Sequence, residues 1–219
     1  MGNSLTGRFI TFEGPDGAGK SSHALQLADR LRGLGRDVVL TREPGGTALG
    51  EQVRHVLLAS DAARDGLTDA LLFNAARHQL VVEVIGPALE RGATVVCDRF
   101  ADSTLAYQGY GAGVPLDRLR ALAELATGGL LPDLTILFDL PPEEGLRRRE
   151  DGAASEVTRF ESAAEHDLAF HRRVREGFLA LAAAEPGRWR VIDAARPAEV
   201  VAAAVWTALA EDLDRVAPT

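Results

Sequence analysis

The segment with the clearest chemistry is a glycine-rich run near the N-terminus. It reads Gly14-Pro15-Asp16-Gly17-Ala18-Gly19-Lys20-Ser21 and fits the phosphate-binding pattern G-x-x-x-x-G-K-[ST]. Glycines let backbone N–H groups converge on phosphate oxygens, the lysine reaches the β- and γ-phosphates, and the serine hydroxyl is a ligand for Mg²⁺. Lys20 is the single lysine of the chain, whose other basic residues are all arginines. This usage indicates a need for a compact ammonium, and the run predicts a nucleotide site.

The elements around this run have the order that the pattern requires. Residues 8–13 form a short β-rich segment that stops at Gly14, and residues 20–34 have helical apolar spacing. The same signals predict further strands at residues 37–42, 94–98, 133–140 and 189–193. Helical segments separate them. Strands that are apolar on both faces and joined by helical crossovers predict an α/β fold, with a parallel sheet covered by helices on both sides.

Two threonines are predicted to begin helices in the first half of the chain. Thr47 follows a Pro-Gly-Gly turn and is expected to cap a helix that runs through Leu58. Thr68 is expected to cap a long apolar helix that runs through Leu89. Pro87 is expected to bend this second helix near its end.

Composition excludes several classes of function. The net charge of −8 argues against a general binder of nucleic acid polymers or of membrane surfaces, because polyanions are held by basic surfaces. No apolar run reaches the roughly 18 residues of a membrane span, and no leader segment is recognisable. Cys97 is the single cysteine and lies in an apolar strand, which suits a reducing compartment, so a cytoplasmic location is expected. A GTPase would carry the guanine-recognition motif N-K-x-D. This chain lacks that motif, because its single lysine, Lys20, belongs to the glycine-rich run.

Four further stretches complete a pattern. They are Thr41–Thr47 (TREPGGT), Phe73–Arg77 (FNAAR), Asp98–Phe100 (DRF) and Ser103–Gly109 (STLAYQG). Together with the glycine-rich run they resemble the bacterial thymidylate kinases, in order, from about Phe9 through Glu161. The resemblance implies a P-loop NTPase fold with a five-stranded parallel sheet and a lid, Mg²⁺-ATP as phosphoryl donor, dTMP as acceptor and a homodimer.

The resemblance also assigns residues to the acceptor base and sugar. Phe73 would stack on thymine and Arg77 would donate to its O4, and the two residues share a helical face because they are four apart. Thr104 and Gln108 would contact the base, and Tyr107 would pack against the deoxyribose C2′. Spacing alone also suits a core phenylalanine with a surface arginine, and an ordinary amphipathic helix over 104–108.

A second set of residues is assigned to the phosphates and the metal. Arg99 would contact the phosphates being joined, Arg54 would bind the dTMP phosphate, and Asp16 would approach the acceptor 3′-OH. Ser21 and Asp98 are expected to hold Mg²⁺ at the carboxyl ends of the strands. An ion pair for Arg99, a solvated helix position for Arg54 and a loop cap for Asp16 are the plain structural alternatives.

The resemblance implies that a lid supplies a catalytic arginine. Some thymidylate kinases carry this arginine in the P-loop, where the chain has Gly17 and Ala18. Residues 147–160 are arginine-rich and contain a small-residue stretch, so we expect them to form a mobile lid, with Arg149 and Arg159 as the catalytic candidates. A solvated run of charges is the alternative.

The prediction is therefore one P-loop kinase domain over residues 1–219, with residues 1–7 as a flexible tail. It would transfer the γ-phosphoryl group of ATP to dTMP, giving dTDP and ADP for dTTP synthesis. Another P-loop nucleotide kinase, or a non-catalytic P-loop switch, is the alternative, because a P-loop by itself indicates a nucleotide and not a reaction.

Overall fold

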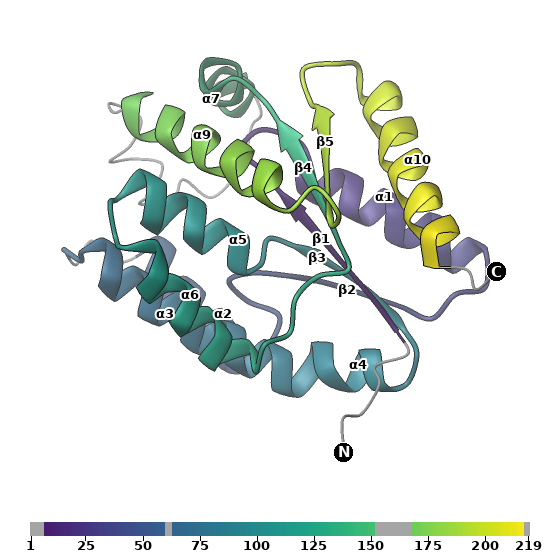
Figure 1. Ribbon diagram of the computed structural model, residues 1–219, viewed down its shortest axis with the longest axis horizontal. Helices are drawn as coiled ribbons and strands as arrows, with labels where there is room; N and C mark the ends of the chain where they lie inside the picture. Colours follow the sequence, from purple (N-terminus) through teal and green to yellow (C-terminus); the bar gives the residue numbers. More distant parts are fainter. Residues whose placement is uncertain (1–6, 60–62, 152–167, 217–219) are drawn as a thin grey trace.

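The computed structural model describes residues 7–59, 63–151 and 168–216 of the chain. A five-stranded parallel sheet with the order β2-β3-β1-β4-β5 crosses its centre (Figure 1). In chain order the strands are β1 (Arg8–Glu13), β2 (Val38–Arg42), β3 (Thr94–Asp98), β4 (Leu134–Asp139) and β5 (Trp189–Asp193). The predicted parallel sheet is confirmed, and the strand limits differ from prediction only at the ends of β2 and β4.

Helices cover both faces of the sheet (Figure 1). On one face lie α1 (Lys20–Gly33) and α10 (Ala198–Val216). The other face and the ends of the sheet carry α2 (Ala48–Ala59), α3 (Gly66–Leu80), α4 (Gly86–Glu90), α5 (Ala101–Thr104), α6 (Leu116–Thr127), α7 (Pro142–Asp151) and α9 (Leu168–Ala184). Within the described ranges, no helix is both long enough and apolar enough to cross a bilayer.

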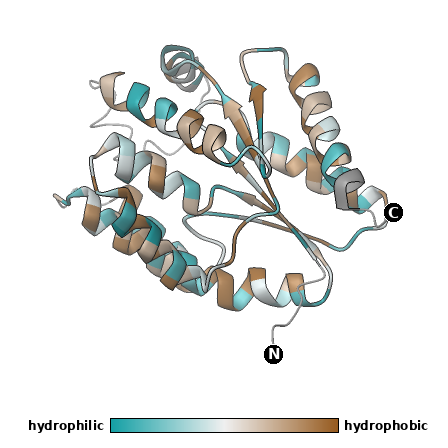
Figure 2. Ribbon diagram, viewed as in Figure 1, coloured by the Kyte–Doolittle hydropathy of each residue, from teal (hydrophilic) through white to brown (hydrophobic). Residues whose placement is uncertain are grey.

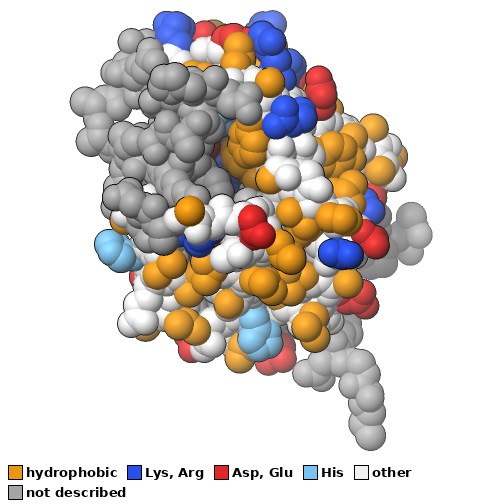
Figure 3. All heavy atoms as spheres, turned by 90° about the vertical axis from the view of Figure 1, so that its left-hand side faces the viewer, with side chains coloured by type: hydrophobic (Ala, Val, Ile, Leu, Met, Phe, Trp, Pro, Cys, Tyr) orange, Lys and Arg blue, Asp and Glu red, His pale blue; other side chains and the backbone are white. Residues whose placement is uncertain are grey.

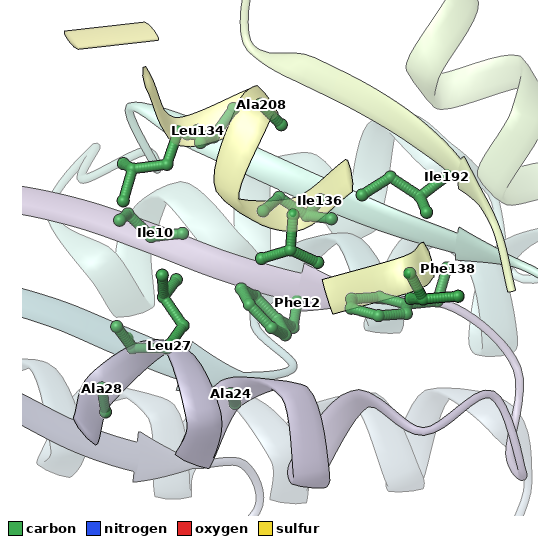
Figure 4. Packing of buried hydrophobic residues seen from close by; sticks show 14 of the residues in the cluster. Ile10, Phe12, Ala24, Leu27, Ala28, Leu134, Ile136, Phe138, Ile192 and Ala208 are labelled. Carbon is green, nitrogen blue, oxygen red and sulfur yellow. The ribbon is translucent and has the colours of Figure 1, made fainter. Parts of the chain in front are cut away.

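The strands are held by apolar side chains on both of their faces. Ile10, Phe12 and Ile136 are fully buried beneath α1 and α10 (Figure 4), and the rings of Phe12 and Phe138 lie 5.2 Å apart. On the opposite face, Phe9 packs with residues of β3 and α4. Hydrophobic residues accordingly follow the strands and recur along the helices between hydrophilic ones (Figure 2). This rigid centre fixes the ends of the strands, where polar residues gather.

The starts of α2 and α3 test the two predicted caps. Thr47 precedes α2, and its hydroxyl accepts a hydrogen bond from the Gly50 amide at 2.9 Å, as a capping residue should. The prediction for Thr68 was wrong. Asp65 caps α3 instead, because its carboxylate accepts the Thr68 amide at 2.7 Å and a carboxylate is favoured at a helix N-terminus.

Two helical segments are wider than an α-helix. The long helix over 66–90 changes to a π-helix, η1 (Val81–Ile85), immediately before the Gly86-Pro87 pair. Pro87 lacks an N–H and its ring crowds the carbonyl four residues earlier, so the expected bend takes the form of a widened turn. A second π-helix, η2 (Leu105–Gly111), continues α5. The ordinary amphipathic α-helix over 104–108 is therefore not formed: Thr104 ends α5, and Tyr107 and Gln108 lie in η2.

Candidate active site

One cavity of about 450 Å³ opens where β1, β2 and β3 end. Its wall consists of the loop after β1 with the start of α1, the ends of β2 and β3 and the residues that follow them, α5 with the start of η2, and residues of α2, α3 and α7. Since β1 lies between β3 and β4 in the sheet, this is the crevice at which open α/β sheets bind ligands. The sequence-predicted site residues on its wall are Asp16, Gly17, Gly19, Lys20, Ser21, Arg54, Phe73, Arg77, Asp98, Arg99, Thr104, Tyr107 and Gln108.

The glycine-rich loop has little room for side chains at two of its positions. Gly14 has φ 137°, and a Cβ there would lie 2.5 Å from the Phe138 carbonyl oxygen. At Gly17, with φ 76°, a Cβ would lie 2.3 Å from the carbonyl oxygen of Gly145 on α7. Such conformations and approaches require glycine. The loop is thus pressed between β4 and α7, while Gly14, Pro15 and Ala18 do not reach the cavity wall.

Lys20 is buried at the start of α1, with 6% of its surface exposed. Its ammonium donates to the carbonyl oxygen of Pro15 at 2.8 Å. Burial, together with the positive charge of Arg99, lowers the pKa of Lys20 to about 8, and the carboxylates of Asp16 and Asp98 oppose this shift. The ammonium is therefore poised for a polyanion, whose negative charge would restore its usual preference for the protonated form.

Ser21 and Asp98 bring oxygen ligands together beside the loop. The Ser21 hydroxyl donates to Asp98 Oδ2, across from α1 to the end of β3. Asp98 Oδ1 is buried, and it has no hydrogen-bond partner in the described part of the chain. No cluster of three or more His, Cys, Asp or Glu side chains that could hold a metal occurs among the described residues. The pair fits a hard cation that takes its other ligands from phosphates and water, as Mg²⁺ does.

Arg99 has an unusual backbone conformation, with φ 70°. Among the described residues it is the one non-glycine residue with a positive φ. The Arg99 amide donates to the Phe12 carbonyl at 2.9 Å, and the Arg99 carbonyl accepts a hydrogen bond from the buried Cys97 thiol at 3.0 Å. Strained conformations of this kind cost about 1–3 kcal/mol and collect at functional sites, which supports a functional role for this arginine.

The buried carboxylate of Glu13 holds the residues that directly follow Arg99. Its Oε1 accepts the Phe100 amide at 2.8 Å, and its Oε2 accepts the Ser103 hydroxyl at 2.5 Å. Burial and the nearby charge of Asp102 raise the pKa of Glu13 to about 8. Sequence reasoning did not assign Glu13, because a single polar residue ending an apolar strand gives no sign of a partner so far along the chain.

The guanidinium of Arg99 is held by a polar cluster at the phosphate end of the cavity. Its Nη2 lies 2.5 Å from Asp16 Oδ1 and its Nη1 donates to the Ser103 hydroxyl at 3.0 Å. The Tyr107 hydroxyl accepts from Arg99 Nη2 and donates to Asp16, both at 3.3 Å, and burial raises the pKa of Tyr107. The ion pair that was the structural alternative for Arg99 is thus present, on the wall of the cavity.

Arg77 is fully buried at the other end of the cavity. Its Nε and Nη2 both donate to Glu43 Oε2, at 2.9 and 2.7 Å. Nη2 also reaches the Thr104 hydroxyl at 3.1 Å, and Nη1 donates to Asn74 Oδ1 at 2.8 Å. Arg77 is therefore no surface arginine. The structure rules out that alternative and shows a guanidinium held rigidly beside the cavity.

The remaining acceptor-site residues line the same cavity as this guanidinium. Phe73 is half-buried one helical turn before Arg77, and Thr104 and Gln108 are buried residues of the same cavity wall. Arg54 reaches over from α2 and donates to the Pro44 carbonyl at 3.1 Å. The wall thus presents an aromatic ring, a cation, a hydroxyl and an amide to one space, which suits a nucleobase.

The predicted lid over residues 147–160 lies largely outside the described residues. The side chain of Arg149 and all of Arg159 lie outside the described residues. Arg148, which sequence reasoning passed over in favour of its neighbour, lies on the cavity wall and donates to Glu144 at 2.9 Å and to the Ala194 carbonyl at 2.8 Å. Glu144 and Arg148 are four residues apart, a spacing that predicts their ion pair on a helix and was the available signal for a fixed Arg148 side chain.

Comparison with known proteins agrees with this geometry. The sequence model of the family described as thymidylate kinase matches residues 12–205. The chain belongs to the thymidylate kinase family. The thymidylate kinase of Thermomicrobium roseum is 55% identical over 207 residues, which are 94% of this chain and 96% of that protein. The thymidylate kinase of Deinococcus radiodurans is 52% identical over 205 residues, covering 94% and 97% of the two chains.

A solved structure extends the comparison to three dimensions. The crystal structure of thymidylate kinase from Ehrlichia chaffeensis superposes with a TM-score of 0.75 at 36% identity, over 93% of this chain and 98% of that one. The chain therefore has the fold of a thymidylate kinase along nearly its whole length, and the predicted P-loop fold is confirmed.

Proposed function

We propose that the protein transfers the γ-phosphoryl group of ATP to dTMP, giving ADP and dTDP for dTTP synthesis. One observation carries this proposal: Lys20 of the phosphate loop and Arg77 of the nucleobase end line the same cavity. A non-catalytic nucleotide switch has no need for a second, base-sized end on its P-loop cavity. Family membership supports the choice of thymidylate as the acceptor.

At the nucleobase end, Phe73 stacks on thymine and Arg77 donates to its O4. Thr104 and Gln108 contact the base edge, and the ring of Tyr107 lies against the deoxyribose. An arginine donates and never accepts, so it favours a carbonyl at this position over the amino group of cytosine. Arg54 takes the acceptor phosphate.

At the phosphate end, the reaction needs alignment and charge more than proton transfer. The dTMP phosphate is already an oxyanion, so no general base is required. Lys20 and Arg99 hold the negative oxygens of the transferred group, and Asp16 orients Arg99 and approaches the 3′-OH of the acceptor. These side chains also displace water, which limits wasteful hydrolysis of ATP.

Mg²⁺ is the proposed metal, and Ser21 and Asp98 are the residues that would hold it. The buried Oδ1 of Asp98, to which no described residue donates, and the adjacent Ser21 hydroxyl make a pair of hard oxygen donors. When bound, the ion supplies positive charge that neutralises the phosphate oxygens of ATP.

A lid over residues 147–160 completes this proposal. Arg149 and Arg159 stay candidates for the arginine that meets the developing charge, and Arg148 joins them because it lines the cavity. On this view, the chain acts as one kinase domain.

The protein is further proposed to form a homodimer through α2, α3 and α6. These helices pack side by side and carry large exposed apolar side chains, at Leu49, Val56, Leu67, Leu71 and Leu125. Hydrophobic side chains gather on the lower part of the corresponding face (Figure 3). Exposed apolar side chains gathered on one face are typical of protein interfaces.

The test is an ADP-release assay with Mg²⁺-ATP and a panel of acceptors: dTMP, dUMP, dCMP, thymidine and no acceptor. We expect fast turnover with dTMP, formation of dTDP in step with ADP, and no turnover by a folded Lys20→Ala variant. Faster turnover with another nucleotide would make the protein a different nucleotide kinase. Nucleotide binding with no transfer to any acceptor would favour the switch.

A further inference from the structure

Glu43 lies at the nucleobase end of the cavity, directly after β2, and is 6% exposed. Its Oε2 receives two charge-assisted hydrogen bonds from Arg77. Its Oε1 is buried, and no described residue donates to it. A carboxylate that is left half satisfied in the interior costs stability, so its presence calls for another explanation.

The hydrogen bonds of Arg77 supply that explanation. An arginine has five N–H donors in a rigid, planar arrangement. Glu43 takes the Nε hydrogen and one on Nη2, Phe100 and Thr104 take the other on Nη2, and Asn74 takes one on Nη1. The second Nη1 hydrogen has no acceptor among the residues that the structure describes. It is therefore the donor that remains for a ligand in the cavity.

We propose that Glu43 is a positioning residue that sets the discrimination among pyrimidines, by holding Arg77 so that it presents a single donor to the base. This inference rests on the proposed function, in which Arg77 meets O4 of thymine. A fixed single donor opposes the amino group of cytosine and matches a carbonyl. A guanidinium released from Glu43 could turn away from the amino group, so that cytosine would be tolerated.

The experiment measures kcat and KM for dTMP and dCMP in the unaltered protein, in Glu43→Gln and in Glu43→Asp. The glutamine removes the charge, and the aspartate keeps the charge but shortens the reach to Arg77. Asp69→Asn is the matched control, since Asp69 is a buried carboxylate on α3 that pairs with Arg64 at 2.8 Å and does not line the cavity.

We expect the ratio of kcat/KM for dTMP over dCMP to fall by about 10-fold or more in Glu43→Gln, and by less in Glu43→Asp. The KM for dTMP should rise more than kcat falls, and the KM for ATP should stay unchanged, because the phosphate end is intact. Asp69→Asn should keep the ratio even where its melting temperature drops.

An unchanged ratio in a folded Glu43 variant overturns the inference and leaves Glu43 with a structural role. If Glu43→Gln does not fold, the ratio in Glu43→Asp decides in its place, because the aspartate still compensates the buried charge of Arg77. If the unaltered protein shows no preference for dTMP over dCMP, the proposed function fails, and the inference fails with it.

Discussion

The guanidinium of Arg99 lies 2.5 Å from the carboxylate of Asp16, which joins the end of β3 to the loop that precedes α1. Each side chain comes from the residues that follow a central strand, so their distance is set by the pairing of β1 with β3. The cation is thereby held beside the phosphate loop before any substrate binds. Preorganised charge of this kind costs no reorganisation when the reaction occurs.

The first prediction concerns the backbone strain at Arg99. Arg99→Gly and Arg99→Ala should both lose kcat by about 100-fold or more, because both remove a charge that acts on the transferred group. Glycine accepts φ 70° without strain, and alanine does not. We therefore expect Arg99→Gly to be more stable than Arg99→Ala by about 1–2 kcal/mol in denaturant unfolding. Equal stabilities would show that the turn carries no strain.

The second prediction is the pH dependence that Lys20 imposes. Its pKa in the free protein is lowered to about 8, so kcat/KM for ATP should be full below that pH and decline above it. Bound phosphates favour the ammonium, so kcat at saturating ATP should decline at a higher pH. The free energy of unfolding changes in the opposite sense. The unfolded chain keeps this proton up to about pH 10.5, whereas the folded protein loses it near pH 8, so the contribution of Lys20 to stability rises as the pH increases between these two values.

Lys20→Arg separates Lys20 from Glu13, whose pKa is also about 8. An arginine does not lose its proton in this range, so the residual activity of the variant should lack the alkaline decline. The same decline in Lys20→Arg would assign it to Glu13 or another group.

The third prediction concerns the sugar. The ring of Tyr107 contacts the Arg99 guanidinium, 5.1 Å from the ring centroid, and the rings of Phe170 and Phe178, whose centroids lie 6.3 and 6.1 Å away, so it is firmly placed. Tyr107→Phe keeps this ring and should keep the preference for dTMP over its ribonucleotide. Tyr107→Ala opens space at C2′ and should reduce the preference. A constant ratio of kcat/KM across the three proteins would remove Tyr107 from sugar selection.

The parts that sequence could predict are those with local signals. The alternation of strand and helix signals predicted the parallel sheet, and the pattern from Gly14 to Ser21 predicted the phosphate loop. Local signals failed for η2, because apolar spacing over a few residues does not distinguish a π-helix from an α-helix. They also failed for Glu13 and Glu43, whose partners lie 87 and 34 residues further along the chain and meet them only through the fold.

The most direct test of the central claim, that thymine lies at the Arg77 end of the cavity, compares Arg77→Ala with Phe73→Ala on dTMP and dCMP. A hydrogen bond to a charged group contributes about 1.5–3 kcal/mol, so Arg77→Ala should lose roughly 10- to 150-fold in kcat/KM with dTMP and little with dCMP. Phe73→Ala should weaken both acceptors in proportion, since any pyrimidine can stack. An equal loss with both substrates in Arg77→Ala would contradict the placement of the base.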